Sequence, residues 1–416
     1  MGQVDLAPLF DSMTMHDEKE RVTKLLVKNL LHTDISLDDW GIPLATPSRD
    51  LTFKTCLGEF SSTNNSFVAM LFRLGHALFD PIDLRLGESV GPEVRRRVEA
   101  LRRKTALSRW LESTASSVVD VDIQAAGVGD WASNVFALLT GHQVSKACDV
   151  ALDAGNPRLA TLISQAGGDA EYKSDLRAQL ATWRDERIDV HIPETVRKIY
   201  GLLAGIADVV EGSNGTGIEK CSDVHVSKDL DWKRALGLQL WYSQPLDATI
   251  GDVYEAYNAL VQDKTAAASR SIARPSPWYI EYPPFAQRPE WKIPAAADIP
   301  DALFSLIRLF ADPSCTLSDV LDPLSFSPAP ADARLPWHIY ILLSRCLRAH
   351  DLADRGPPPS PPAGGNKAGE NGVEGNSPTA DLLASSFALQ LERMGKVHEA
   401  VFVLLHIMPQ VNYDIA

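Results

Sequence analysis

The spacing of hydrophobic residues predicts helices along most of the chain. Apolar positions recur three, four and seven residues apart, which is the period of an α-helix with one buried face. The segment FVAMLFRLGHALF after Ser66 is apolar on nearly all sides, which indicates a helix buried on most of its surface. The expected helices are residues 17–31, 66–79, 91–116, 130–141, 142–155, 157–166, 171–186, 194–204, 230–242, 249–262, 301–311, 336–350, 381–394 and 397–408.

Glycine, asparagine and proline separate these helices at positions that suit each residue. Gly155 stops one helix, Asn156 is placed to cap the next, and Pro157 occupies its first turn. Gly395 turns the chain between the last two helices. Such short connections make successive helices antiparallel neighbours. The pattern therefore predicts an all-α fold, an irregular stack of helical hairpins without a fixed repeat length.

Five segments lack the helical pattern. TDISLDDWGIPLATPSRD (residues 33–50) is expected to be a loop, because glycine and proline interrupt it. VVDVDI (118–123) alternates like a strand, but its two acidic residues favour a linker. EGSNGTGIEKCSD (211–223) is expected to be a loop, and the seven prolines of residues 275–300 forbid regular structure there. Residues 355–379 contain one valine and no aromatic residue, so we expect them to be disordered.

The charge balance argues against nucleic acid and membranes as direct partners. Lys and Arg number 40 against 54 Asp and Glu, a net charge of −14, whereas phosphates and anionic lipids attract basic surfaces. No apolar run approaches the roughly 18 residues of a membrane helix, and the N-terminus lacks the basic start and apolar block of a signal peptide. The five cysteines are at least 31 residues apart, which excludes CxxC metal knuckles and favours reduced thiols in a nuclear or cytosolic protein.

The search for catalytic chemistry is negative. EGSNGTG lacks the GK[ST] ending of a phosphate loop, and no metal or cofactor motif is present, so we expect no enzyme activity and no cofactor. His142, Cys148 and Asp149 invite a Cys–His nucleophile, but Cys148 adjoins the alanine-rich packing face, which favours a structural thiol. The basic run Arg95-Arg96-Arg97 with Arg102-Arg103-Lys104 has two interpretations: a solvated helix face, or a signal for import or an acidic partner.

Several strings in the chain agree, in order, with a known family. They are ALFDP (77–81), RRKTALSRWLESTAS (102–116), HQVSKACDVALDAGNPRLATLISQ (142–165), IYGLLAG (199–205), LDWKRALGLQLWYS (230–243), LPWHIYILLSR (335–345) and FVLLHI (402–407). From about residue 66 to 416 the chain resembles the ninety-six-kilodalton nucleoporin family of the Y-shaped nuclear pore scaffold complex. The fungal member of this family is the C-terminal product of a self-cleaving nucleoporin precursor.

The resemblance implies a scaffold protein of the nuclear pore in the nuclear envelope, supporting nucleocytoplasmic transport by protein–protein assembly. It implies the ancestral coatomer element fold, an α-solenoid folded back on itself. Residues 66–116 and 250–416 would form its trunk and residues 128–242 its crown, after a partly irregular lead-in at residues 1–64. The crown would dock on the neighbouring stalk nucleoporin, and the trunk would carry the WD-repeat propeller Sec thirteen.

Two parts of the family pattern are not found. Residues 1–64 show no three-stranded pattern, so the β-rich blade that completes the propeller is expected to be absent, and with it tight binding of Sec thirteen. The tail module that joins the hub of the Y also has no counterpart. The alternative interpretation is a vesicle-coat subunit of the same fold, as in the COPII coat. Its long proline-rich region has only a short counterpart here, which favours the pore.

The predicted partner-binding residues lie in the crown. An apolar hairpin face left exposed there would bind the neighbouring nucleoporin, and the alternative is that the same residues belong to the core. The candidates are Phe136, Leu139, Leu159, Leu162 and Ile163.

Overall fold

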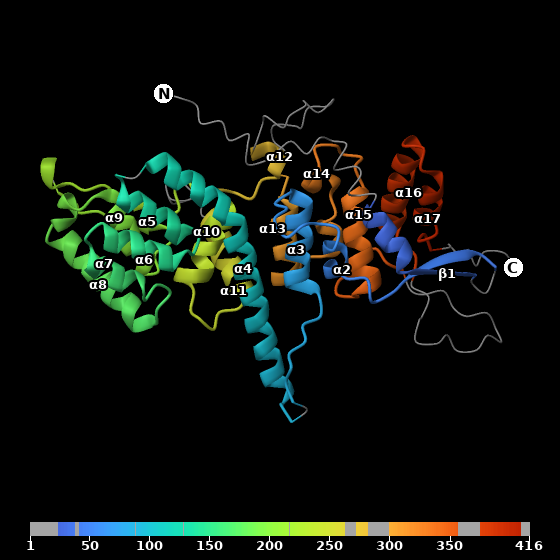
Figure 1. Cartoon of the computed structure of the whole chain (residues 1–416), viewed down its shortest axis with the longest axis horizontal. Helices are drawn as coiled ribbons and strands as arrows, with labels where there is room; N and C mark the ends of the chain where they lie inside the picture. Colours follow the sequence, from blue (N-terminus) through green and yellow to red (C-terminus); the bar gives the residue numbers. More distant parts are fainter. Residues whose placement is uncertain are drawn as a thin grey trace. The chain divides into compact units, whose positions relative to one another are not determined.

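A computed structural model describes residues 24–37, 41–87, 89–127, 129–215, 217–262, 272–281, 299–356 and 375–408. These residues are mostly helical and contain no extended sheet, which confirms the all-α prediction (Figure 1). The chain divides into two compact units: unit 1 comprises Met1–Pro81 and Ser276–Ala416, and unit 2 comprises Ile82–Pro275. The predicted helix at 17–31 is present over residues 24–31, and its first part lies outside the described residues.

Unit 2 is a stack of helices joined by short turns. Its elements are α4 (Pro92–Ala126), α5 (Trp131–Thr140), α6 (Val144–Asp153), α7 (Pro157–Ile163), α8 (Ala170–Asp185), the 3-10 turn Ile188–His191, α9 (Glu194–Leu203), β3 (Val209–Val210), the 3-10 turn Gly217–Glu219, β4 (Val224–His225), α10 (Trp232–Leu238), the π-helical segment Gln239–Ser243 and α11 (Ile250–Gln262). The hairpin α6–α7 has the predicted punctuation: Gly155 adopts a φ of +76°, Asn156 is the N-cap residue and Pro157 begins α7.

The interpretation of residues 118–123 as a linker is wrong, because α4 continues through them to Ala126. The alternation of valine and aspartate fits a helix here, since Val119 is buried while Asp122 forms an ion pair with Arg234 at 2.5 Å. The predicted loop at 211–223 connects the short strands β3 and β4. Aspartates hold it: the Ser213 amide donates to Asp189 and the Gly212 amide to Asp223.

Unit 1 is assembled from both ends of the chain. Its elements are the helix at 24–31, β1 (Thr33–Leu37), β2 (Pro43–Pro47), α2 (Phe53–Leu57), α3 (Phe67–Phe79), α12 (Trp278–Glu281), α13 (Ala302–Ala311), the 3-10 turn Leu317–Asp319, α14 (Pro323–Phe326), α15 (Arg334–Tyr340), the π-helical segment Ile341–Cys346, α16 (Pro378–Arg393) and α17 (Val397–Leu404). The nearly all-apolar α3 is buried on most sides, as predicted, and Ser66 caps it.

An aromatic cluster forms the core around α3. The ring of Phe53 contacts those of Phe72 and Phe79, with ring centroids 5.9 and 6.3 Å away. Gly75 makes this contact possible, because a Cβ at this position would lie 2.3 Å from the Phe53 ring. The Asp80 carboxylate accepts hydrogen bonds from the Phe53 and Lys54 amides and thereby caps α2. The N-terminal segment is thus fixed directly onto α3.

Two predictions for irregular segments of unit 1 are wrong. Residues 33–50 contain an antiparallel hairpin, with Ile35 opposite Ala45, rather than only a loop. Gly41, with a φ of +76°, lies in the turn, and the two prolines occupy the ends of β2, where a missing amide is tolerated. Within 275–300, one helical turn (α12) forms despite the prolines, since Trp278 and Tyr279 donate to the Phe326 and Leu324 carbonyls and fix it against α14.

The predicted disordered segment 355–379 is only partly within the described residues, because 357–374 lie outside them. Residues 375–379 are ordered and lead into α16, which corrects the predicted boundary. The other expected helices, from 171–186 to 397–408, are found with end shifts of a few residues or with a π-helical continuation.

Candidate protein-interaction site

The structure separates the five predicted partner-binding residues into two groups. Leu139, Leu159 and Ile163 are buried in the core of unit 2, so the prediction that they are exposed is wrong. Phe136 and Leu162 are half-buried and remain available at the surface. The cause is the geometry of α7: Leu159 and Ile163, four residues apart, share its inner face, and Leu162 lies at the edge of that face.

Phe136 and Leu162 lie beside different helices. The Lys198 ammonium of α9 lies 5.7 Å from the centre of the Phe136 ring, a cation–π contact, and the same ammonium is 3.5 Å from Glu194. Leu162 lies beside α8, since its carbonyl accepts a hydrogen bond of 2.7 Å from the Tyr172 hydroxyl. Phe136 is therefore already partly covered by a lysine, whereas Leu162 adjoins a second feature of the surface.

That feature is a half-buried aromatic group on α8 and α9. The Trp183 and Tyr200 ring centroids are 4.7 Å apart. Burial raises the pKa of Tyr172 to about 12, and the nearby Tyr200 contributes to the shift. Burial also raises the pKa of Tyr200, partly opposed by Arg158 of α7. We call Leu162, Tyr172, Trp183 and Tyr200 the aromatic surface.

Sequence reasoning missed the three aromatic members of this surface. Tyr172 and Trp183 are eleven residues apart, which is three helical turns and places them on one face of α8. This spacing was available from the sequence as a signal. Half-exposed tyrosine and tryptophan next to polar residues such as Arg158 are typical of protein interfaces, where such side chains are enriched.

A second apolar surface lies at one end of unit 1. On α17, Val397 (55% exposed), Val401 (51%) and Leu404 (42%) are spaced four and three residues apart and so share one face. The neighbouring hairpin leaves Ile35 and Leu37 exposed, and the Ala45 amide of β2 donates to the Leu405 carbonyl at 2.9 Å. We call this group of α17 and hairpin residues the end surface.

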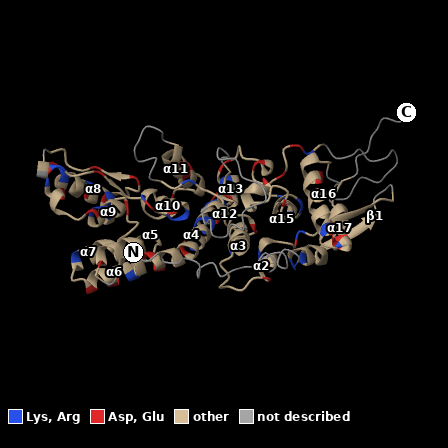
Figure 2. Ribbon diagram, turned by 90° about the horizontal axis from the view of Figure 1, so that it is seen from above, with Lys and Arg blue, Asp and Glu red and all other residues tan. Residues whose placement is uncertain are grey.

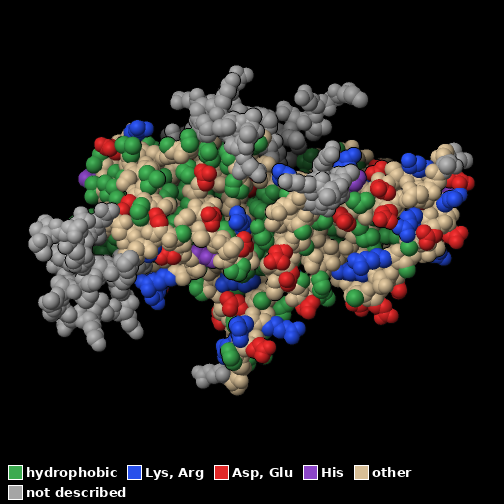
Figure 3. All heavy atoms as spheres, turned by 180° about the vertical axis from the view of Figure 1, so that it is seen from behind, with side chains coloured by type: hydrophobic (Ala, Val, Ile, Leu, Met, Phe, Trp, Pro, Cys, Tyr) green, Lys and Arg blue, Asp and Glu red, His purple; other side chains and the backbone are tan. Residues whose placement is uncertain are grey.

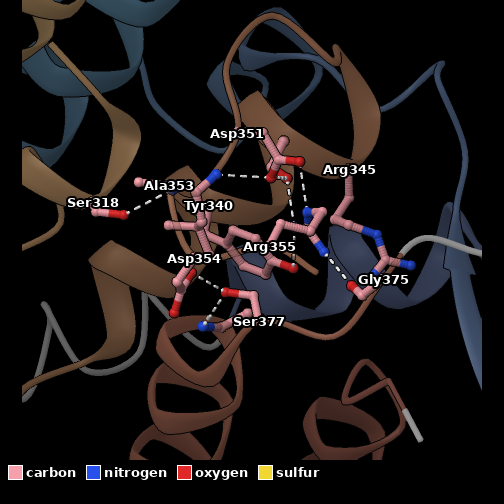
Figure 4. A network of polar contacts seen from close by, with 12 residues as sticks. Ser318, Tyr340, Arg345, Asp351, Ala353, Asp354, Arg355, Gly375 and Ser377 are labelled. Atoms are coloured by element: carbon pink, nitrogen blue, oxygen red, sulfur yellow. Dashed lines mark hydrogen bonds and ion pairs between the residues drawn. The ribbon is translucent and has the colours of Figure 1, made fainter. Parts of the chain in front are cut away.

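A polar network closes the chain near the start of α16 (Figure 4). The Arg355 guanidinium donates to Asp351 (2.5 Å), to the Ser344 hydroxyl (3.0 Å) and to the Gly375 carbonyl (3.0 Å). Asp354 accepts from the Ser377 hydroxyl and the Thr379 amide, at 2.5 and 2.7 Å. We call this network the clamp, because it joins the two chain segments that flank residues 357–374.

The residues considered for nucleophilic chemistry are engaged elsewhere. The His142 ring stacks on Trp241, with centroids 4.8 Å apart, and its Nδ1 is 2.8 Å from Glu112. The half-buried Cys148 thiol contacts the Ala160 carbonyl at 3.6 Å, and burial raises the pKa of this thiol, which opposes thiolate formation. Among the described residues, no group of three or more His, Cys, Asp or Glu side chains is placed to hold a metal ion.

The charged side chains do not define a binding groove of one sign. Figure 2 shows Lys and Arg interspersed with Asp and Glu along the helices of both units. No helix in the described part of the chain is long and apolar enough to cross a membrane. The two apolar surfaces are therefore the features that point to a partner, and a partner protein is the kind that they fit.

Comparison with known proteins agrees with this assignment. Residues 133–413 match the family model described as Nuclear protein 96, or Nup96. The chain is similar to nucleoporin nup189 of Schizosaccharomyces pombe, with 27% identity over 410 residues, covering 98% of this chain and 20% of that protein.

Two further relatives extend the comparison. The Nup98-Nup96 nuclear pore complex protein of Drosophila melanogaster is 27% identical over 313 residues, which are 75% of this chain and 14% of that protein. Nucleoporin NUP145 of Chaetomium thermophilum is 40% identical over 128 residues, 30% of this chain and 7% of that protein. The chain thus spans a quarter or less of the length of each of these relatives.

Proposed function

Because the chain belongs to the Nup96 family, we propose that it is a structural scaffold nucleoporin of the Y-shaped outer-ring complex, supporting nucleocytoplasmic transport through protein–protein assembly. The relatives are nuclear pore proteins, which supports a structural pore component rather than an enzyme. They also favour the pore over the vesicle-coat alternative.

The aromatic surface is the observation that carries this proposal. A tryptophan, two tyrosines and a leucine remain half-exposed on consecutive helices of unit 2, although a chain of this length has ample core in which to bury them. Each offers a large contact area with little loss of side-chain entropy on binding. We assign the docking of the neighbouring stalk nucleoporin to this surface, with Leu162 at its edge, and keep Phe136, which contacts Lys198 of α9, as a further candidate.

The end surface supports a second contact of the scaffold. Its exposed valines and leucines adjoin a two-stranded hairpin whose outer strand, β1, has a free edge among the described residues. A sheet edge beside an apolar helix face suits a β-rich partner, which adds backbone hydrogen bonds to side-chain contacts. We propose that unit 1 carries the Sec thirteen propeller here. Because the described residues supply two strands here and not three, this contact is expected to be weak and salt-sensitive in a pull-down with residues 1–416.

Three substitutions to glutamate on α7 test the crown assignment. Leu162→Glu places a charge on the aromatic surface and should abolish binding to the neighbouring stalk nucleoporin without unfolding unit 2. Thr161→Glu is the matched control, because Thr161 is exposed on the same helix, and it should leave binding intact. Leu159→Glu buries an unpaired charge and should destabilise unit 2 by several kcal/mol.

Melting temperature and partner binding are measured together for each variant. Trp183→Glu, on α8, should behave like Leu162→Glu. The assignment fails if folded Leu162→Glu and Trp183→Glu variants both bind the partner normally, or if Thr161→Glu is as damaging as Leu162→Glu.

A further inference from the structure

The first three turns of α4 form a helical projection that the functions above do not use. None of residues 92–102, here called the spur, is buried. The helix contributes to the core of unit 2 only further on, through Arg103, Leu107, Trp110, Leu111, Ala115 and Val119. In Figure 1 the spur extends away from the other helices of unit 2. A helical end of this kind is marginal by itself in water.

The chain holds the spur in place with a strap. Residues 82–87 and 89–90, which are neither helix nor strand, run beside it, and Arg95 donates to the Val90 and Gly87 carbonyls at 3.0 and 2.6 Å. Arg102 donates to the Asp83 and Leu84 carbonyls at 2.7 and 2.9 Å. Because hydrogen bonds from a charged donor are the stronger kind, the spur is preorganised rather than a frayed helix end.

These contacts divide the basic run into two classes. Arg95 and Arg102 hold the strap, Arg103 is buried and 3.5 Å from Glu99, and Lys104 donates to the carbonyls of Pro245, Leu246 and Ala248. Arg96 and Arg97 are exposed and have no ion pair or hydrogen bond to another described residue. Arg96 and Arg97 are thus the two cations of the basic run that do not hold the helix or its strap in place.

One of these cations lies within an apolar stripe. Val94 (53% exposed), Arg97 and Leu101 (46% exposed) are three and four residues apart, so they share one helical face, and Arg96 lies about 100° round the helix from Arg97. Basic, hydrophobic and acidic side chains occur together at the lower tip in Figure 3. A helix that only needed solubility would carry polar residues at all these positions.

We propose that this face of the spur docks an acidic amphipathic helix of a partner protein. The spur, residues 92–102, carries four basic and two acidic side chains, a net charge of +2, within a chain whose net charge is −14. An acidic helix is attracted to the spur and repelled by the rest of the surface, which fixes where it docks. Apolar side chains on that helix would cover Val94 and Leu101, and its carboxylates would pair with Arg96 and Arg97.

Other polyanions fit less well. Nucleic acid and anionic membranes need several free cations to meet phosphates, whereas the spur offers two. Nucleic acid also has no apolar groups placed to cover a valine–leucine stripe. An acidic helix supplies both the charge and the apolar surface.

A reciprocal charge exchange tests the proposal on the full chain. The probe is a synthetic helical peptide with leucine and glutamate repeating every three to four residues, and its binding is followed by fluorescence anisotropy. Arg97→Glu should weaken binding by about tenfold or more, and a peptide with lysine in place of glutamate should bind Arg97→Glu better than the unchanged protein. Arg109→Glu, exposed on the packed part of α4, makes the same change in charge and should alter binding less than about twofold.

Melting temperatures should be the same for both variants, because both arginines are exposed. The proposal is overturned if the acidic peptide does not bind, or if Arg97→Glu and Arg109→Glu weaken it equally. It is also overturned if phosphatidylserine vesicles or duplex DNA bind in an Arg97-dependent way while the peptide does not.

Discussion

Both units contain a helix that continues into a π-helical segment, but the polar side chains near the two segments differ. In each unit a helix continues into a π-helical segment: α10 into Gln239–Ser243 and α15 into Ile341–Cys346. Both segments lie in the core, and buried polar side chains lie within them or next to them. Unit 2 pairs its buried Arg234 with two aspartates, whereas unit 1 buries His406, whose pKa is lowered so that the ring stays neutral.

In unit 2 the buried cation is Arg234. Its guanidinium is 2.7 Å from Asp231 and 2.5 Å from Asp122. Burial alone would raise the pKa of Asp231, but Arg234 and Lys233 outweigh it, and this pKa lies below its usual value. The ion pair between Asp231 and Arg234 therefore persists to a lower pH than that of an ordinary aspartate.

In unit 1 the corresponding group is His406. Burial, with Arg345 and His338 nearby, lowers the pKa of His406 to about 3, against a partial compensation from the Phe402 and Val403 carbonyls. The ring packs edge-on against Trp337 and Phe402, with centroids 5.2 and 4.9 Å away. Both units thus contain a helix that continues into a π-helical segment, but their stabilities should depend differently on pH because of a few core side chains.

Removing Arg234 should have the largest effect on stability. Arg234→Met leaves two half-buried carboxylates without their cation and should destabilise unit 2 by about 3–5 kcal/mol. Arg109→Met removes an exposed arginine from the same unit and should change stability by less than about 0.5 kcal/mol. Chemical denaturation measures both, and equal effects would mean that the ion pairs do not stabilise unit 2.

Mild acid should separate the two units. In the unfolded chain the histidine pKa is near 6.5, so the unfolded state binds a proton below this pH while native His406 does not. The stability from neutral His406 is complete above pH 6.5 and is lost as the pH falls, by about 2 kcal/mol between pH 6.5 and 5. Burial also lowers the pKa of His350, which adds to the loss in unit 1.

Hydrogen exchange at pH 7.5 and at pH 5 measures this difference for each unit separately. Amides of α15 and α17 should lose protection at pH 5, whereas those of α10 should keep theirs. His406→Phe should reduce the pH dependence of unit 1, and an unchanged dependence in this variant would contradict the role of His406.

The clamp should make an intermediate contribution. Arg355→Ala removes the donor to Asp351, Ser344 and Gly375 and should destabilise unit 1 by about 1–3 kcal/mol. Arg355→Lys keeps the charge but not the planar fork, and it should restore only part of this loss. If thermal melting shows Lys and Ala to be equivalent, the fork geometry is unimportant.

Excision of residues 357–374 should have the smallest effect. The Gly356 amide donates to the Asn376 carbonyl at 2.8 Å, so a short glycine–serine linker can join the clamped ends without strain. Loop-closure entropy changes slowly with length, so stability should shift by less than about 1 kcal/mol. A loss comparable with that of Arg355→Ala would show that the excised residues pack on unit 1.

Local sequence signals predicted most of the longer helices and several of their ends, although α4 runs past its expected end and the short helices α2, α12 and α14 were missed. Gly155, Asn156 and Pro157 specify the turn between α6 and α7 through their own backbone preferences, and Ser66 and Asp80 bound α3. Such signals act within one turn and need no knowledge of the rest of the chain.

Contacts between distant segments were not predictable in the same way. The β-hairpin at 33–47 is fixed in part by the bond from Ala45 to Leu405, which is far away in the sequence. Likewise, the spacing of apolar residues does not show which edge of an apolar helix face is exposed to solvent. From the sequence, Leu159 and Leu162 are therefore equally good surface candidates, whereas in the structure Leu159 is buried and Leu162 lies beside α8. Of the five candidates predicted from the sequence, only Phe136 and Leu162 lie at the surface. The sequence prediction missed the aromatic residues Tyr172, Trp183 and Tyr200.

The division of unit 1 between the two ends of the chain has a consequence during synthesis. Unit 2 is continuous, so it can fold once residue 275 has left the ribosome. The hairpin of residues 33–47 must wait for Leu405, more than 350 residues later, to complete its contact. At about 5–20 residues per second, the delay is roughly 20–70 s. For the first part of this delay, until α13 has been synthesised, the side of α3 that packs on α13 is uncovered, so the nascent N-terminal segment is a natural substrate for chaperones.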